Sequence, residues 1–366
     1  MTNYEQALLR RQQKIRERSN YLPEYTPDVP ESRLNPLKPE LINGVLRKGH
    51  KMLISGDSKM GKSFMLIELG IALATGSEWM GFRCRQSSVL YINLEIDEDS
   101  FAHRVAAVKR ARGVHSQVQF FTWNLRGENL SLRDLKDILI LRMDEGQCPI
   151  DVVIIDPIYK LIEGDENNAT DIARFCRNLD EIAEEMRVSV ICCHHHSKGH
   201  QGAKRTIDRA SGSGVFARDT DALIDITEIE QSEAVKTRAP VPGASAWRME
   251  FTLREFADPD PVNIWFCYPI HIIDSDVLTD SPLCGTSAAA RAKNRKTTTA
   301  ADRKIKFENA FEKLAEAKKN EPVDVNELAK ELKLTPKTVR SRIQEFSDEF
   351  KLTNGLVFKK ADSEAA

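Results

Sequence analysis

A glycine-rich run near residue 60 has the residue types and spacing of a phosphate-binding loop. Residues 56–63 have the sequence GDSKMGKS, which matches G-x-x-x-x-G-K-[ST] in full, between the strand-like KMLISG and the helix-like FMLIELGIALATG. In that setting, backbone N–H groups and the helix N-terminus face a phosphate chain, and the lysine adds a cation at the β- and γ-phosphates. We predict that ATP binds to Gly56, Asp57, Ser58, Lys59, Met60, Gly61, Lys62, Ser63 and Phe64.

Two carboxylates follow strand-like segments further along the chain. Asp156 ends DVVIID and, together with the Ser63 hydroxyl, could ligate Mg²⁺, although an ordinary strand-end aspartate before Pro157 would look the same. Glu95 ends SVLYINLE, so we expect it on the strand, at the carboxyl edge of a sheet, where it could polarise a water for attack on the γ-phosphate. These residues predict Mg²⁺-dependent hydrolysis of ATP.

Three consecutive histidines, His194, His195 and His196, follow the apolar VSVICC. They could form a metal site, act as a general base or sense the γ-phosphate. Neighbouring strand residues point to opposite faces, so three in a row converge poorly on a metal. We expect His194 and His195 to be sensors, and a solvated loop remains an alternative for His196 and His200.

The next segment, residues 197–214, is rich in Gly and Ser and carries several basic side chains. Such a segment cannot build a core, and it is suited to contact the backbone phosphates of DNA. Its candidate DNA contacts are Lys198, Lys204 and Arg205. Arg218, just beyond it, could stabilise transition-state charge across a subunit boundary, or it could pair with Asp219 or Asp221.

Short apolar runs that alternate with amphipathic stretches must position these residues. Such runs, separated by helix-like segments, are typical of a parallel sheet buried on both faces. The predicted strands are 51–56, 88–95, 117–123, 151–157 and 188–196, and the predicted helices are 62–76, 98–113, 131–145 and 170–186. We expect an α/β fold with helices flanking a parallel sheet, which ends in an antiparallel pair over 246–256 and 262–273.

Length and composition bound the class of protein. The 366 residues exceed one ordinary domain, and 41% hydrophobic with 30% charged residues is a globular composition. The formal net charge of -2 excludes a uniformly basic nucleic-acid coat but leaves room for basic patches. Since the seven cysteines include no C-x-x-C pair and no apolar run approaches the roughly 18–20 residues that cross a bilayer, we expect a cytoplasmic protein with free thiols and no membrane partner.

Changes in composition predict four parts of the chain. They are an N-terminal arm over 1–35, an ATPase domain over 36–283, a basic flexible linker over 284–304 and a small second domain over 305–366.

The last part has the pattern of a winged helix-turn-helix domain. VDVNELAKELKL and TPKTVRSRIQEF predict two helices with Leu328, Ala329, Leu332, Val339 and Ile343 inward, and KLTNGLVFKK supplies an Asn-Gly turn for the wing. The second helix would enter a major groove of DNA with Lys337 and Arg340 in contact, or the module could serve protein contacts instead.

The span from about residue 36 to 275 resembles the RepA-like ATPases of plasmids and other mobile elements, the AAA_25 group of the RecA/DnaB-type ring helicases. The resemblance rests on LINGVLRKGHKMLISGDSKMGKSFMLIELGIALATGSEWMG, VLYINLE, DVVIIDP, CHHHSKG, RASGSGVFARDTDALID, FTLREF and PVNIWFCYPIH. It implies a RecA-like P-loop core and a hexamer with ATP between adjacent subunits.

The resemblance also implies roles for the residues that match the family pattern. Lys62 and Ser63 would hold the phosphates and Mg²⁺, Asp156 the metal and Glu95 the attacking water. His194 and His195 match the histidine pair of the family, Lys198 has its usual place, and Arg218 falls at the arginine finger. The extension beyond residue 285 lies outside the match.

We therefore expect a ring-forming ATPase that acts as a helicase or translocase on single-stranded DNA in replication of a plasmid or other mobile element. The alternative is an ATP-switched replication or regulatory protein that binds duplex DNA through its C-terminal domain and does not unwind it. A scaffold ATPase that binds no DNA is a third class.

Overall fold

The structure is a computed structural model, in which the chain divides into two units, Met1–Pro39 and Glu40–Ala366. It describes Gln13 and residues 28–57, 60–144, 149–165, 168–196, 209, 215–279, 281–284, 304, 306–316, 318, 322–332, 334, 336–347, 349–353 and 355–359. In the first unit, the described residues from 28 to 39 carry one 3-10 turn, η1 (Glu31–Arg33).

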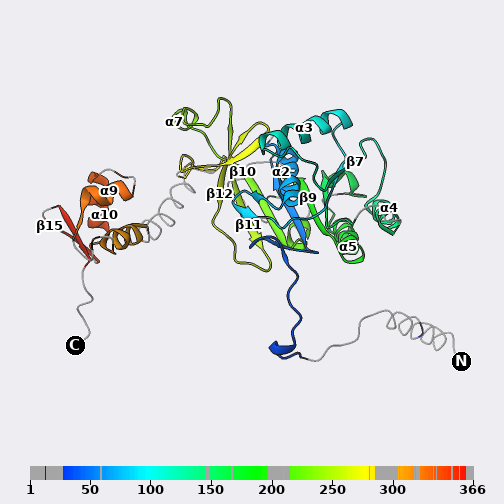
Figure 1. The fold of residues 1–366 in the computed structure, drawn as a ribbon, viewed down its shortest axis with the longest axis horizontal. Helices are drawn as coiled ribbons and strands as arrows, with labels where there is room; N and C mark the ends of the chain where they lie inside the picture. Colours follow the sequence, from blue (N-terminus) through cyan, green and yellow to red (C-terminus); the bar gives the residue numbers. More distant parts are fainter. Residues whose placement is uncertain are drawn as a thin grey trace. The chain divides into compact units, whose positions relative to one another are not determined.

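A nine-stranded sheet forms the centre of the second unit (Figure 1). Six neighbouring strands are parallel, in the order β10-β3-β9-β8-β6-β7. Their bounds are β3 Lys51–Gly56, β6 Val89–Asn93, β7 Phe120–Asn124, β8 Val152–Asp156, β9 Ser189–His195 and β10 Ala222–Glu228. The predicted α/β fold is therefore confirmed, and β10 is a parallel strand that the apolar pattern did not reveal.

Helices cover both faces of the parallel strands. Their bounds are α2 Lys62–Thr75, α3 Glu98–Ala111, α4 Leu132–Asp144, α5 Ala169–Glu185 and α6 Val215–Asp219. α2 and α3 pack on one face, and α4, α5 and α6 on the other. Because successive strand residues point to opposite faces, Met52 and Ile54 join the core under α2 whereas Leu53 joins the core under α5.

Three antiparallel strands extend the sheet beyond β10. They are β11 (Ser245–Leu253), β12 (Val262–Cys267) and β13 (Ile270–Ile273), in that order. The predicted antiparallel pairing of 246–256 with 262–273 is confirmed by β11 and β12, but 262–273 forms two strands, because the chain turns back at Tyr268 and Pro269 and the two halves pair with each other. This turn brings β13 into contact with α2, and β13 thereby also contacts the phosphate-binding loop.

Short elements complete this part of the chain. They are β1 (Glu40–Ile42), β2 (Leu46–Arg47), β4 (Glu78–Trp79), β5 (Phe82–Arg83), η2 (Ile158–Leu161) and α7 (Glu233–Lys236). Within the described ranges, no helix combines the length and the apolar character needed to cross a membrane.

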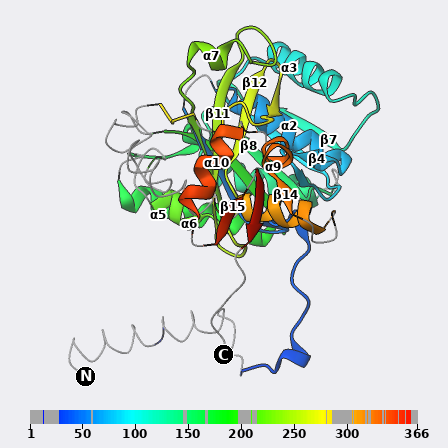
Figure 2. The ribbon, with the colours of Figure 1, turned by 90° about the vertical axis from the view of Figure 1, so that its left-hand side faces the viewer.

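The C-terminal elements build a hydrophobic core of their own. Residues 306–316 are helical. The elements that follow are β14 Val323–Asp324, α9 Val325–Glu331, α10 Pro336–Glu345, β15 Phe350–Thr353 and β16 Leu356–Lys359, with the strands in the order β14-β16-β15. α9, α10 and β15 lie together in both views (Figure 1 and Figure 2). The side chains predicted to point inward do so: Leu328, Ala329, Val339 and Ile343 are buried and Leu332 packs against them.

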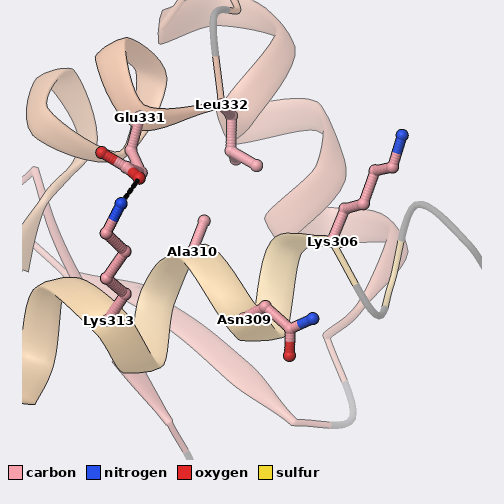
Figure 3. A pocket seen from close by; sticks show the side chains of 6 residues that line it. All are labelled: Lys306, Asn309, Ala310, Lys313, Glu331 and Leu332. Atoms are coloured by element: carbon pink, nitrogen blue, oxygen red, sulfur yellow. Dashed lines mark hydrogen bonds and ion pairs between the residues drawn. The ribbon is translucent and has the colours of Figure 1, made fainter. Parts of the chain in front are cut away.

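A pocket of about 300 Å³ lies between the helix over 306–316 and the end of α9 (Figure 3). Ala310 and Leu332 supply its apolar lining. At its edge the Lys313 Nζ and Glu331 Oε1 atoms are 2.6 Å apart and link the two helices. An exposed pair of this kind contributes about 0–1 kcal/mol, so the core beneath it holds the helices together.

Gly70 allows α2 to pack closely on β7 and β8. A Cβ atom at this position would lie 2.5 Å from the Phe120 ring and 3.1 Å from the Ile154 Cδ1 atom. Alanine would gain about 1 kcal/mol of helix propensity, but overpacking costs about 1–3 kcal/mol. We therefore expect Gly70→Ala to lower the free energy of unfolding by about 1 kcal/mol in urea titrations followed by circular dichroism. Phe120→Leu should reduce the loss in the double variant, and an unchanged or higher stability of Gly70→Ala would contradict this packing.

Candidate nucleotide-binding site

The phosphate-binding loop joins the carboxyl end of β3 to α2. Gly61 caps α2 with a φ of 86°, and a Cβ there would lie 3.0 Å from the Phe266 ring, so glycine is required on both counts. The Lys62 ammonium is buried and donates to the carbonyl oxygens of Gly56 at 2.9 Å and Asp57 at 2.7 Å. The loop therefore holds its lysine at the carboxyl edge of the sheet. Ser58 and Lys59 lie outside the described residues.

Asp156 ends β8, and its carboxylate is held by two buried donors. The Tyr91 hydroxyl donates to Oδ2 at 2.6 Å, and the Cys193 thiol donates to Oδ1 at 2.9 Å. Burial and the neighbouring carboxylate raise the pKa of Tyr91 and of Cys193, so both groups keep their protons and stay donors. The Asp156 carboxylate is thereby fixed in one orientation.

Ser63 and Asp156 together offer a hydroxyl and a carboxylate. In the described part of the chain, no three His, Cys, Asp or Glu side chains converge as a metal-binding group. Mg²⁺ prefers hard oxygen donors and is often held by one or two protein oxygens together with substrate phosphates. The donor set of this site fits that mode of binding.

Glu95 lies beyond the end of the strand, so the prediction that places it on the strand is wrong. β6 ends at Asn93, whose buried side chain turns the chain: its Oδ1 accepts the Ile96 N–H at 3.0 Å, and its Nδ2 donates to the Ile96 carbonyl at 2.6 Å. This turn leaves Glu95 exposed next to the sheet edge. Motif matching missed Asn93, and the available signal was a single polar residue inside an apolar run.

The carboxylates at this edge of the sheet affect the pKa of Lys62. Burial lowers the pKa of Lys62, and the charges of Asp156, Asp57 and Glu95 oppose that fall. The structure thus brings together the predicted phosphate, metal and water positions, and the roles of these residues stay predictions.

His194 and His195 end β9, which lies between β3 and β8. His195 pairs with Gly56 in the sheet. The buried His194 ring packs against Phe216 with centroids 6.0 Å apart, whereas the His195 ring lies 5.7 Å from the Tyr159 ring. The two histidines thus end the strand between β3 and β8 with their rings against different neighbours, and their sensor role stays a prediction.

His196 is a buried site residue, and its interpretation as a solvated loop residue is wrong. Its side chain is 2% exposed, with Nδ1 3.0 Å from Asp57 Oδ1 and Nε2 2.8 Å from Asp225 Oδ1. Burial alone would lower the pKa of His196, but the bonds to Asp225 and Asp57 outweigh it and raise the pKa. The two carboxylates thus favour the doubly protonated form of the ring. His200 lies outside the described residues.

Asp225 and Arg209 continue this polar network into β10 and β11. The Arg209 Nη1 donates to Asp225 Oδ2 at 2.8 Å and pairs with Glu250, which is opposite Asp225 in the sheet. Burial alone would raise the pKa of Asp57, but His196, Lys62 and Arg209 outweigh burial and lower the pKa of this carboxyl group. Arg209 and Asp225 are the first and last residues of RASGSGVFARDTDALID, a segment that carries the family resemblance, but the sequence assigned neither of them a role, and Glu250 lies outside every quoted segment.

Strand β13 also supports the phosphate-binding loop. The His271 Nδ1 is 2.6 Å from Glu68 Oε1 in α2, and its Nε2 is 3.2 Å from the Met60 carbonyl oxygen in the loop. Both side chains are buried. A strand distant in sequence thus fixes a carbonyl group of the phosphate-binding loop.

Two aromatic side chains pack together next to Ser63. Phe64 packs edge-on against Tyr268 with centroids 5.3 Å apart, and the Arg104 guanidinium lies 5.1 Å from the centre of the Phe64 ring. Tyr268 is 72% exposed. An exposed ring beside the phosphate-binding loop could stack on a nucleotide base.

Arg218 does not join this site. It lies in α6, which precedes the amino end of β10, whereas the loop follows the carboxyl end of the parallel β3. Asp219 pairs with Lys51, and Asp221 pairs with Arg254, so the two carboxylates proposed as partners of Arg218 are engaged elsewhere. The Arg254 Nη2 donates to the Arg218 carbonyl at 2.9 Å, and the Arg218 side chain is exposed.

Most of the predicted DNA contacts lie outside the described residues. Lys198, Lys204 and Arg205 fall in the range 197–208, and the side chain of Lys337 in α10 is also outside the described part. Arg340 is exposed on α10.

A mostly parallel sheet with a phosphate-binding loop after β3 and a strand-end carboxylate on β8 is the fold of a P-loop NTPase core. The model of the AAA_25 family, an AAA domain, matches residues 17–201. The chain belongs to this family.

Solved structures similar to the chain have low sequence identity. An ATPase domain is 15% identical with a TM-score of 0.45, covering 59% of this chain and 81% of that one. A DnaB-like replicative helicase, described with its interactions with primase, is 14% identical with a TM-score of 0.45, and the alignment covers 65% of this chain and 63% of that one. A KaiC-like protein from Pyrococcus horikoshii OT3 is 13% identical with a TM-score of 0.43, covering 64% and 93%. No curated protein matches the chain significantly.

Tyr91→Phe tests the support of the predicted magnesium ligand. The variant keeps the buried ring but removes the hydroxyl that donates to Asp156. Loss of such a partner weakens metal binding by about 10–100-fold, so we expect at least a tenfold rise in the Mg²⁺ concentration for half-maximal ATPase activity. Tyr159→Phe is the control, and an equal shift in that variant or none in Tyr91→Phe would contradict this role.

Proposed function

We propose that the chain is a ring-forming, ATP-hydrolysing helicase or translocase that acts on DNA in replication of a plasmid or other mobile element. One observation carries the proposal: Lys62, Asp156 and Glu95 meet at one edge of the sheet, whereas Arg218 lies at the amino end of β10. Membership of the AAA_25 family supports the ATPase activity. The resemblance to ring helicases supports the action on DNA.

The chemistry follows from the charges at the site. Lys62 would exchange the carbonyls of Gly56 and Asp57 for phosphate oxygens, and Ser63 with Asp156 would hold Mg²⁺, which neutralises phosphate charge. The exposed Glu95 would orient and deprotonate the attacking water. His194 and His195, between β3 and β8, would sense the γ-phosphate.

Arg218 would complete the site of a neighbouring subunit. An arginine that stabilises transition-state charge must lie next to the γ-phosphate. Arg218 cannot do so within its own chain, because its helix precedes β10 and the loop follows the parallel β3. A closed ring of identical contacts, a hexamer in the resemblance, would give every loop an arginine from the next subunit.

The C-terminal elements have the order of a winged helix, and they favour a second candidate function. Arg340 is exposed on α10, the second helix of the pair, and β15 with β16 forms a hairpin beside it. We propose that this part contacts duplex DNA through Lys337 and Arg340. The alternative function is therefore an ATP-switched DNA-binding replication or regulatory protein without unwinding activity.

Substitutions in the loop and at Glu95 test the ATPase assignment. Lys62→Ala should reduce ATP hydrolysis to background, and persistent activity would refute the assignment. Glu95→Gln should bind ATP as the wild type does and hydrolyse it about 10²–10⁴-fold more slowly, because it keeps the loop but loses the base. Assays with single-stranded DNA and a forked duplex then separate the functions: stimulation with unwinding supports the helicase, and duplex-specific binding without unwinding supports the switch.

Mixing two inactive variants tests whether Arg218 acts across subunits. Arg218→Ala and Lys62→Ala should each be inactive alone. In a mixed ring some sites combine a normal Lys62 with a normal Arg218 from the neighbour, so we expect part of the wild-type ATPase activity to return. Lys62→Ala mixed with the double variant should stay inactive, since every loop lacks its lysine. No recovery in mixed assemblies verified by differential tags would place Arg218 outside the reaction.

A further inference from the structure

A buried carboxylate on β10 holds the chain on both sides of residues 197–208. Asp225 has 0% exposure and accepts a hydrogen bond from the His196 ring at 2.8 Å and one from Arg209 at 2.8 Å, each on a different oxygen. His196 is the last described residue before this segment, and Arg209 is the next one after it. The predicted DNA contacts Lys198, Lys204 and Arg205 fall between them.

The same histidine holds the first turn of the phosphate-binding loop. Its backbone N–H donates to the Gly56 carbonyl at 3.3 Å, and its ring Nδ1 is 3.0 Å from the Asp57 carboxylate. Lys62 donates to the backbone carbonyls of the same two residues. A movement of Lys62 towards a phosphate therefore acts on the turn that His196 holds.

We propose that Asp225 is a positioning residue that fixes this turn through His196 and couples it through Arg209 to the basic segment. The coupling to DNA rests on the proposed function, whereas the effect on the loop does not. Among the described residues, Asp225 makes no hydrogen bond to Lys62 or Asp156. Its hydrogen-bonded link to the phosphate-binding loop runs through the His196 ring.

The connection requires a doubly protonated His196. Asp57 and Asp225 accept hydrogen bonds, so each ring nitrogen must carry a proton to bond to its carboxylate. The other charges around this pair are Arg209 and Glu250 beyond Asp225, and Lys62 beyond Asp57.

The pH dependence follows from this arrangement. The two carboxylates raise the pKa of His196 above its ordinary 6.5, although burial opposes them. Both bonds are therefore complete at and below pH 6.5, and one is lost as the pH rises through the raised pKa. ATPase activity should fall over the same interval.

Asp225→Asn in the full chain tests the proposal. We expect stimulation of ATP hydrolysis by single-stranded DNA to fall about tenfold, the effect of losing one charge-assisted hydrogen bond. The alkaline decline of the DNA-free ATPase activity should move to lower pH, because His196 loses one of its two carboxylates. His196→Gln should remove this decline, and the double variant should be no worse than the more severe single variant.

Asp274→Asn is the matched control. Asp274 accepts hydrogen bonds from the Trp265 indole and the Leu278 N–H, both at 2.8 Å, in the β12–β13 region. This variant should lose stability and keep the wild-type pH profile and DNA stimulation.

The outcomes separate the two proposals. A folded Asp225→Asn protein with the wild-type pH profile and stimulation overturns the inference, as do additive effects in the double variant. A wild-type ATPase that ignores DNA refutes the DNA function, and the DNA-free pH profile still decides the Asp225–His196 link. If Asp225→Asn does not fold, as judged by circular dichroism, a decline that persists in His196→Gln overturns the inference.

Discussion

Parallel pairing of β3 with both of its neighbours is the constraint on which this site depends. Carboxyl ends of parallel strands lie at one edge, so residues distant in sequence meet there. Ser55 in β3 pairs with His194 on one side and with Asp225 on the other. A slip of β10 by one residue would turn Asp225 to the opposite face of the sheet and break its bonds to His196 and Arg209.

The loop is held from two sides by buried polar groups, and these are costly to bury unless they are hydrogen-bonded. His196 with Asp225 holds the first turn, and His271 with Glu68 holds the Met60 carbonyl. Removing one partner of a buried hydrogen-bonded pair leaves the other partner unsatisfied, at a cost of about 1–3 kcal/mol. The loop conformation is therefore specified by tertiary contacts as well as by its glycines.

Local chemistry explains how much of this could be predicted from sequence. The spacing of glycines and lysine in the loop and the apolar run before Asp156 are local signals, and they predicted the strand before the loop, the helix after it and the parallel sheet correctly. Glu95 was misplaced because an apolar run hides the end of β6 at Asn93. The role of His196 depends on the strand order β9-β3-β10, which no local pattern encodes.

Among the described residues of the site and its supporting network, carboxylates outnumber cations. Lys62, His196 and Arg209 are three cations in a network with five carboxylates, namely Asp57, Asp225, Glu250, Asp156 and Glu95. A triphosphate would add negative charge to an edge that is already negative, and the loop N–H dipoles with one lysine offset only part of it. In the proposed function, Mg²⁺ at Asp156 would offset part of the remaining negative charge. In the proposed assembly, the exposed Arg218 of a neighbouring subunit would supply further positive charge, and efficient hydrolysis would then depend on assembly.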